Sequence, residues 1–146
     1  MGDDIHAELK KLLNERIVVL DGAMGTTIRE YGLDESAARG ERFEAIKKDI
    51  LNNGDILSIT QSDVIGDIHR KFFEAGSDIA STNTFSATTL AQSEFFVDDP
   101  RETGKGVKDQ EFFQKIIEDN FLRDLIWEMN YKSAQICRKW ADRVSN

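Results

Sequence analysis

Hydrophobic residues along the chain fall into two patterns, short unbroken runs and stripes with helical spacing. The unbroken runs lie at residues 17–20, 56–59 and 79–82, and each is followed by polar or turn-forming residues. Runs of this length that contain β-branched residues are typical of strands buried on both faces of a parallel sheet. We therefore expect three short parallel strands at these positions.

The stripes with helical spacing predict helices that flank these strands. A first stripe begins at Ile5, a second follows Ser62 as its predicted N-cap and ends at Gly76, and a third helix starts at Ser86. The last stripe predicts one long C-terminal helix through Phe113, Ile117, Phe121, Leu125 and Met129. Strands that alternate with helices predict an α/β fold of right-handed βαβ units.

Length and composition suit one soluble domain, residues 1–146, in which 40% of the residues are hydrophobic. Residues 97–110 are polar and contain the single proline, Pro100, so we expect an exposed loop there. The formal net charge of −8 disfavours nucleic acid and anionic membranes as partners. No apolar run approaches the roughly 20 residues of a membrane span. A single cysteine, Cys137, excludes an internal disulfide, and we expect a cytoplasmic protein.

Several short blocks occur in an order that points to one known family. They are VLDGAMGT at residues 19–26, NGDILSITQ at 53–61, IH at 68–69, EAGSDI at 74–79 and TNTF at 82–85. Together they resemble the front part of the homocysteine-binding barrel of homocysteine S-methyltransferases, closest to the cobalamin-dependent methionine synthases. Two positions depart from the usual pattern, since Ser81 replaces an acidic residue before TNTF and Ser62 replaces a proline after Thr-Gln.

The resemblance implies a (β/α)₈ TIM barrel that transfers a methyl group to the thiol of homocysteine, giving methionine. A complete barrel needs about 250 residues, so 146 residues with three strands predict an incomplete, partial barrel. The family implies zinc held by three cysteines and cobalamin on separate domains. Those cysteines belong to later blocks, and Cys137 lies within a predicted helix as a small apolar residue. We expect no metal or cofactor on this chain alone and assign no catalytic residue.

The resemblance and the positions of polar residues at strand ends suggest substrate-binding residues. They are Asp21, Gly22, Thr60, Thr82, Asn83 and Thr84. Each also has a structural interpretation: Asp21-Gly22 as a simple turn, Thr60 as a helix cap, and residues 82–84 as a capping and turn cluster. His6 and His69 have no cysteine or carboxylate at zinc-ligand spacing, and we expect both to be surface or structural residues.

Three functions are compatible with these patterns. The chain is an inactive N-terminal fragment of a methyltransferase, one half of a split enzyme completed by a partner chain, or a non-catalytic interaction module. A partial sheet has open edges, which favour a complementary barrel half or a second copy as partner. Weak homocysteine binding is compatible with each of them.

Overall fold

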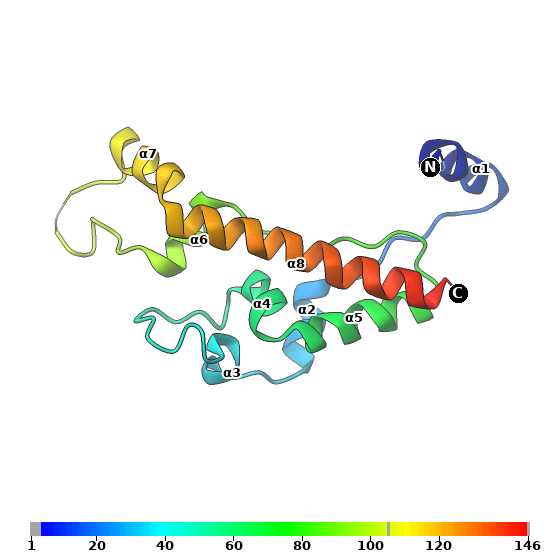
Figure 1. The fold of residues 1–146 in the computed structure, drawn as a ribbon, viewed down its shortest axis with the longest axis horizontal. Helices are drawn as coiled ribbons and strands as arrows, with labels where there is room; N and C mark the ends of the chain where they lie inside the picture. The colour runs from blue at the N-terminus through cyan, green and yellow to red at the C-terminus, as the bar shows by residue number, and fades with distance from the viewer. Residues whose placement is uncertain (1–3, 105, 146) are drawn as a thin grey trace.

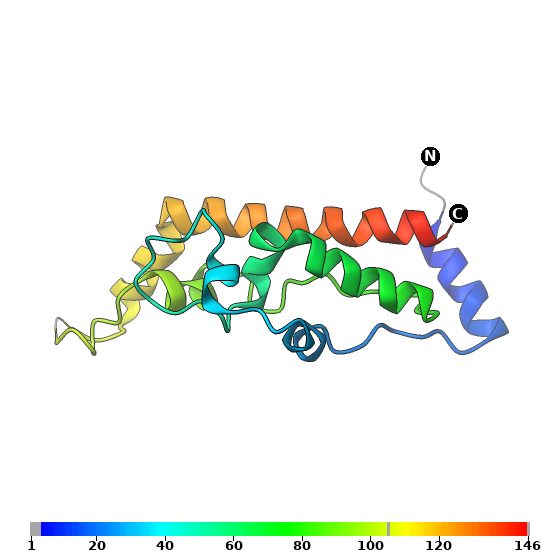
Figure 2. The ribbon, with the colours of Figure 1, turned by 90° about the horizontal axis from the view of Figure 1, so that it is seen from below.

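Helices dominate the computed structural model, which describes residues 4–104 and 106–145 (Figure 1). They are α1 (Ile5–Glu15), α2 (Met24–Glu30), α3 (Glu35–Arg39), the 3₁₀ helix η1 (Gly54–Ile56), α4 (Leu57–Thr60), α5 (Ser62–Glu74), α6 (Thr89–Phe96), α7 (Gln110–Glu118) and α8 (Asn120–Val144). Helix α8 runs along most of the length of the molecule, with α5 beside it (Figures 1 and 2). Helix α1 lies near the C-terminal end of α8, and α7 lies at the opposite end.

Acidic and hydroxyl side chains explain where most of these helices begin. Asp4, Asp34, Thr88, Asp109 and Asp119 each accept a hydrogen bond from the backbone amide three residues later. An N-cap of this kind satisfies an amide that has no partner within the helix. The prediction of Ser62 as an N-cap is wrong, because Ser62 is the first residue of α5 and Gln61 precedes it without a side-chain cap. The helix predicted from Ser86 begins instead at Thr89.

The predicted partial (β/α)₈ barrel with three parallel strands is wrong. The run 56–59 lies in η1 and α4, where Ile56, Leu57 and Ser58 are buried. A short buried apolar run has the same composition in a strand and in a helix, so the pattern alone did not separate them. Within residues 4–104 and 106–145, β pairing is limited to an isolated parallel bridge between Leu20 and Ile79.

Aspartate side chains take over the hydrogen bonding at both ends of this bridge. In the middle, Asp21 N donates to Ile79 O (2.9 Å) and Ile79 N donates to Val19 O (3.2 Å). Beyond them, Val19 N donates to the Asp78 carboxylate and Ser81 N donates to Asp21 Oδ2, both at 2.9 Å. Side chains therefore replace the backbone acceptors that a longer parallel ladder would use.

The hydrophobic core lies where α4, α5 and α8 meet. Leu57, Ile65, Leu125 and Met129 are each at most 1% exposed and pack in one cluster. Gly66 lets α5 approach α8 closely, because a Cβ atom there would lie 2.6 Å from Trp140 Nε1. Burial of apolar surface between these helices, rather than sheet formation, stabilises the fold.

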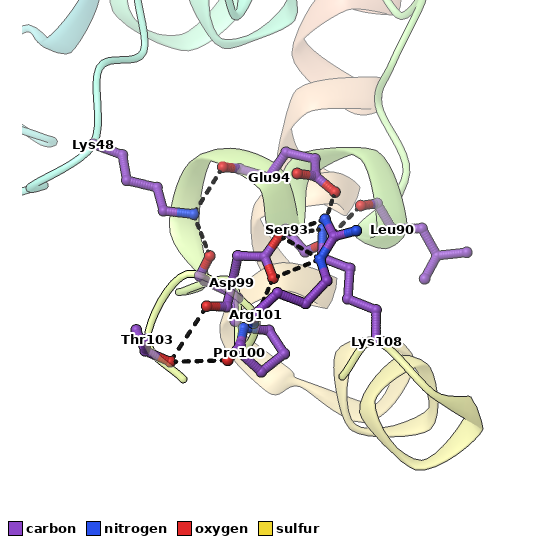
Figure 3. Close-up of polar contacts among 10 residues, drawn as sticks. Lys48, Leu90, Ser93, Glu94, Asp99, Pro100, Arg101, Thr103 and Lys108 are labelled. Atoms are coloured by element: carbon purple, nitrogen blue, oxygen red, sulfur yellow. Dashed lines mark hydrogen bonds and ion pairs between the residues drawn. The ribbon is translucent and has the colours of Figure 1, made fainter. Parts of the chain in front are cut away.

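An ionic cluster ties the segment after α6 to the rest of the molecule (Figure 3). Asp99 is 8% exposed and accepts hydrogen bonds from Arg101, while Lys108 Nζ lies 3.3 Å from Asp99 Oδ2 and 2.7 Å from Glu94 Oε1. Lys48 Nζ donates to the carbonyl oxygens of Glu94 (3.1 Å) and Val97 (2.5 Å). These contacts hold Asp99 and Lys108 close to the C-terminal end of α6.

Among the described residues, every helix is either too short or too polar to span a lipid bilayer.

His69 on α5 is fully buried, and neither ring nitrogen has a hydrogen-bond partner among the described residues. Burial lowers the pKa of His69, against the carboxylate of Asp21, which raises it. The folded state therefore favours the neutral ring. The free energy of unfolding keeps its full value above the ordinary histidine pKa of about 6.5. It decreases as the pH falls below that value, because the unfolded chain then binds a proton that the folded chain does not.

We expect the melting temperature of the chain to decrease when the pH is lowered from 7.5 to 5.5. The decrease should be smaller in a His69→Leu variant. Scanning calorimetry at several pH values measures how steeply the melting temperature of each protein changes with pH. Both proteins contain the same carboxylates, so the difference between the two slopes reports His69. Identical slopes in the two proteins would show that burial of His69 does not couple folding to pH.

Candidate functional site

A cavity of about 1020 Å³ opens between three segments of the chain. Its lining comes from residues 22–33, residues 51–57 and residues 81–86, together with Phe95 of α6. Cavities for small ligands usually measure about 300–1,000 Å³, so this one lies at the upper end of that range. Arg29 and Asp55 are the charged residues of its lining.

The first side of the cavity is formed by Gly22 and by α2. Gly22 lies against the ring of Phe72, where a Cβ atom would be 2.5 Å from Cε1 and 2.8 Å from Cζ. Only glycine fits this approach without displacing the ring or the backbone. Helix α2 then adds apolar side chains, Met24 and Ile28, and the exposed guanidinium of Arg29.

The second side is the segment 82–86, which we call the cavity wall. Thr82 Oγ1 and Thr84 Oγ1 lie 2.8 Å apart and remain at the surface of the cavity. Between them, the buried amide of Asn83 donates from Nδ2 to Gly54 O (2.8 Å) and Ser58 Oγ (3.1 Å). Ser133 of α8 donates to Asn83 O at 3.0 Å. The middle of the wall is thus fixed to η1, α4 and α8.

The third side is the segment around η1, which holds buried polar groups. Asp55 is 4% exposed, and Asp55 Oδ2 accepts a hydrogen bond from Ser86 N at 2.5 Å. Burial raises the pKa of Asp55, while backbone amides of Ser86 and Phe85 act in the opposite direction. Asn53 and Gln92 exchange hydrogen bonds through their amides at 2.7 and 3.1 Å, and Gln92 Nε2 also donates to Ser86 O.

The cavity draws its lining from the GAMGT, NGD and TNTF parts of the sequence blocks, which are distant in the chain. A comparison with protein-family models matches the homocysteine S-methyltransferase family over residues 18–146. The chain belongs to this family. The match covers most of the chain and confirms the resemblance, and the family's general chemistry is methyl transfer to homocysteine.

The predicted substrate-binding residues are divided between the cavity and its surroundings. Gly22, Thr82, Asn83 and Thr84 line the cavity, although the side chain of Asn83 is occupied by its own hydrogen bonds. The structure places the other two predicted residues outside the lining. Asp21 accepts from Ser81 N, and Thr60 of α4 donates to Ile56 O of η1 at 3.4 Å.

The lining residues that sequence reasoning did not predict include Arg29, Asp55 and Phe85. Asp55 lies in the NGDILSITQ block, and its position in that block was the available signal. Phe85 is 99% exposed at the cavity, although it belongs to the TNTF block. Arg29 lies on α2, just after the DGAMGT block, and carried no signal of its own in the sequence.

The zinc site that the family implies does not fit the residues described here. Residues 4–104 and 106–145 contain no group of three His, Cys, Asp or Glu that could hold a metal ion. Cys137 lies within α8 and is partly buried, and this burial raises the pKa of its thiol. A raised pKa disfavours the thiolate that binds metal. We therefore derive no catalytic step through a metal from these residues.

Proposed function

We propose that the cavity binds homocysteine and forms part of the substrate site for methyl transfer to its thiol. The observation that carries this proposal is that Gly22 and the Thr82–Thr84 hydroxyl pair line one cavity, although 60 residues separate them. Membership of the homocysteine S-methyltransferase family supports the substrate class.

The lining offers complementary groups for each part of an amino acid of this kind. The hydroxyl groups of Thr82 and Thr84 can exchange hydrogen bonds with the ammonium and carboxylate groups. Arg29 forms no ion pair with other described residues and can pair with a carboxylate at the cavity edge. Met24, Ile28 and Leu57 provide apolar surface for the methylene groups.

Activation of the thiol is the part of the reaction for which these residues offer no group. A homocysteine thiol has to lose its proton to become a strong nucleophile. We propose that the chain alone binds homocysteine without converting it to methionine.

We expect saturable binding of L-homocysteine to the chain at a single site, with weaker binding of D-homocysteine. Titration calorimetry under reducing conditions measures both affinities, and a methionine assay with zinc and a methyl donor tests turnover. Absence of saturable binding at millimolar homocysteine would contradict the proposal. Formation of methionine by the chain alone would contradict its second half.

A further inference from the structure

Two anchors hold the cavity wall, and they differ in chemistry. The middle of the wall is held by the neutral amide of Asn83. Its end is held by the carboxylate of Asp55, which accepts from the backbone amide of Ser86. The two hydroxyl groups of the cavity, on Thr82 and Thr84, lie in the same five-residue segment. Their placement therefore depends on both anchors.

For stability alone, a buried carboxylate at position 55 is less favourable than a neutral hydrogen-bond acceptor. It is 4% exposed, and no Lys, Arg or His among the described residues forms an ion pair with it. Burial of a carboxylate without a cation is costly, whereas a neutral acceptor would satisfy one amide at lower cost. The raised pKa of Asp55 has burial as its first cause, in agreement with this cost.

A carboxylate has a second acceptor oxygen, which a neutral amide side chain of the same size lacks. Both of its oxygens are acceptors, so it can receive the consecutive amides of Phe85 and Ser86 together. An asparagine has one acceptor oxygen, and its NH₂ group would face the second amide donor-to-donor. The two acceptor oxygens of the carboxylate therefore restrict the orientation of the wall more narrowly than an isosteric amide would.

We propose that Asp55 is a positioning residue of this cavity, whose carboxylate sets the orientation of residues 82–86 and thereby the affinity for homocysteine. In this proposal Asp55 acts on the ligand through the wall, because its carboxylate accepts a hydrogen bond from Ser86 N. The identity of the ligand rests on the proposed function above, whereas the role of Asp55 rests on the buried contact with Ser86.

An Asp55→Asn variant separates positioning from a general structural role. We expect its free energy of unfolding to change little, because removal of the buried charge offsets the loss of one acceptor for the wall amides. Its affinity for homocysteine is expected to fall at least tenfold. Asp98→Asn is the matched control, since Asp98 is exposed and outside the cavity lining, and it should change neither quantity. Denaturant unfolding and titration calorimetry measure the two quantities.

A measurement on the unsubstituted chain keeps the inference testable if the variant does not fold. The amide proton shifts of Phe85 and Ser86 should titrate together, with a midpoint above the ordinary aspartate range. Arg29 on α2 is the other charged residue of the lining. Amide shifts that do not titrate above that range would overturn the role of Asp55.

The outcomes distinguish the two proposals. Absence of homocysteine binding by the unsubstituted chain overturns the proposed function, and with it the effect of Asp55 on affinity. Binding that is equally tight in the unsubstituted chain and in Asp55→Asn overturns only the inference about Asp55. A parallel loss of stability and affinity in Asp55→Asn also overturns it, because it shows a structural acceptor without a separate effect on the ligand.

Discussion

Replacement of Leu125 by alanine should lower the free energy of unfolding by about 2–5 kcal/mol, as for other fully buried leucines. Leu125 is 1% exposed and belongs to the cluster in which α8 meets α4 and α5. Truncation removes buried methyl groups and leaves a cavity that the neighbouring helices fill only in part. Denaturant unfolding followed by circular dichroism measures the change.

The matched control is Leu13→Ala on α1, which makes the same chemical change at a side chain that is 58% exposed. We expect its effect to stay within about 0.5 kcal/mol. Equal effects of the two substitutions would show that the junction of α4, α5 and α8 does not stabilise the chain as described here.

A Gly22→Ala variant should lose at least tenfold in homocysteine affinity, which corresponds to about 1.4 kcal/mol. The added methyl group would lie 2.5 Å from Phe72 Cε1 and 2.8 Å from Cζ, so either the ring or the backbone that leads into α2 has to move. Movement of this backbone displaces one side of the cavity from the Thr82–Thr84 side. Titration calorimetry measures the loss.

The double variant Gly22→Ala/Phe72→Leu tests the cause of that loss. Leucine lacks the ring atoms that the new methyl group would meet, so we expect the double variant to recover most of the lost affinity for homocysteine. Phe72→Leu alone provides the reference for the cycle. If the double variant binds no better than Gly22→Ala, the contact with Phe72 is not the reason why glycine occupies this position.

The sequence predicted the family more accurately than the secondary structure. The family depends on residues such as Asp21 and Gly22 in fixed blocks, and these can be read directly. The strand prediction at 56–59 depended on a pattern shared by buried helices and buried strands. Burial of Leu57 where α4 meets α5 and α8 is a tertiary effect, which the local pattern does not contain.

The division of the last predicted helix also has a local cause that its apolar stripe concealed. The stripe from Phe113 to Met129 continues through Asp119, but Asp119 has an extended backbone and caps α8 through Leu122 N. An aspartate that competes with the helix by capping is a side-chain effect that hydrophobic spacing does not detect.

The cavity could be predicted only in part for similar reasons. Gly22 and the Thr82–Thr84 block occupy recognisable motifs, and the structure places them in the lining. Asp55 was missed because its importance comes from burial against Ser86, a contact between residues 31 positions apart. The predicted positions Asp21 and Thr60 follow apolar runs, but neither residue lines the cavity, because Asp21 accepts from Ser81 N and Thr60 donates to Ile56 O.

The most direct test of the central claim, that homocysteine occupies this cavity, is an amide NMR titration of the isotopically labelled chain with L-homocysteine under reducing conditions. We predict saturable shifts at Gly22, Thr82, Thr84 and Ser86 with a common dissociation constant, and little change in α8 at Ala134 and Gln135, which line a separate surface groove. Unchanged amides throughout the cavity, or shifts confined to α8, would contradict the claim.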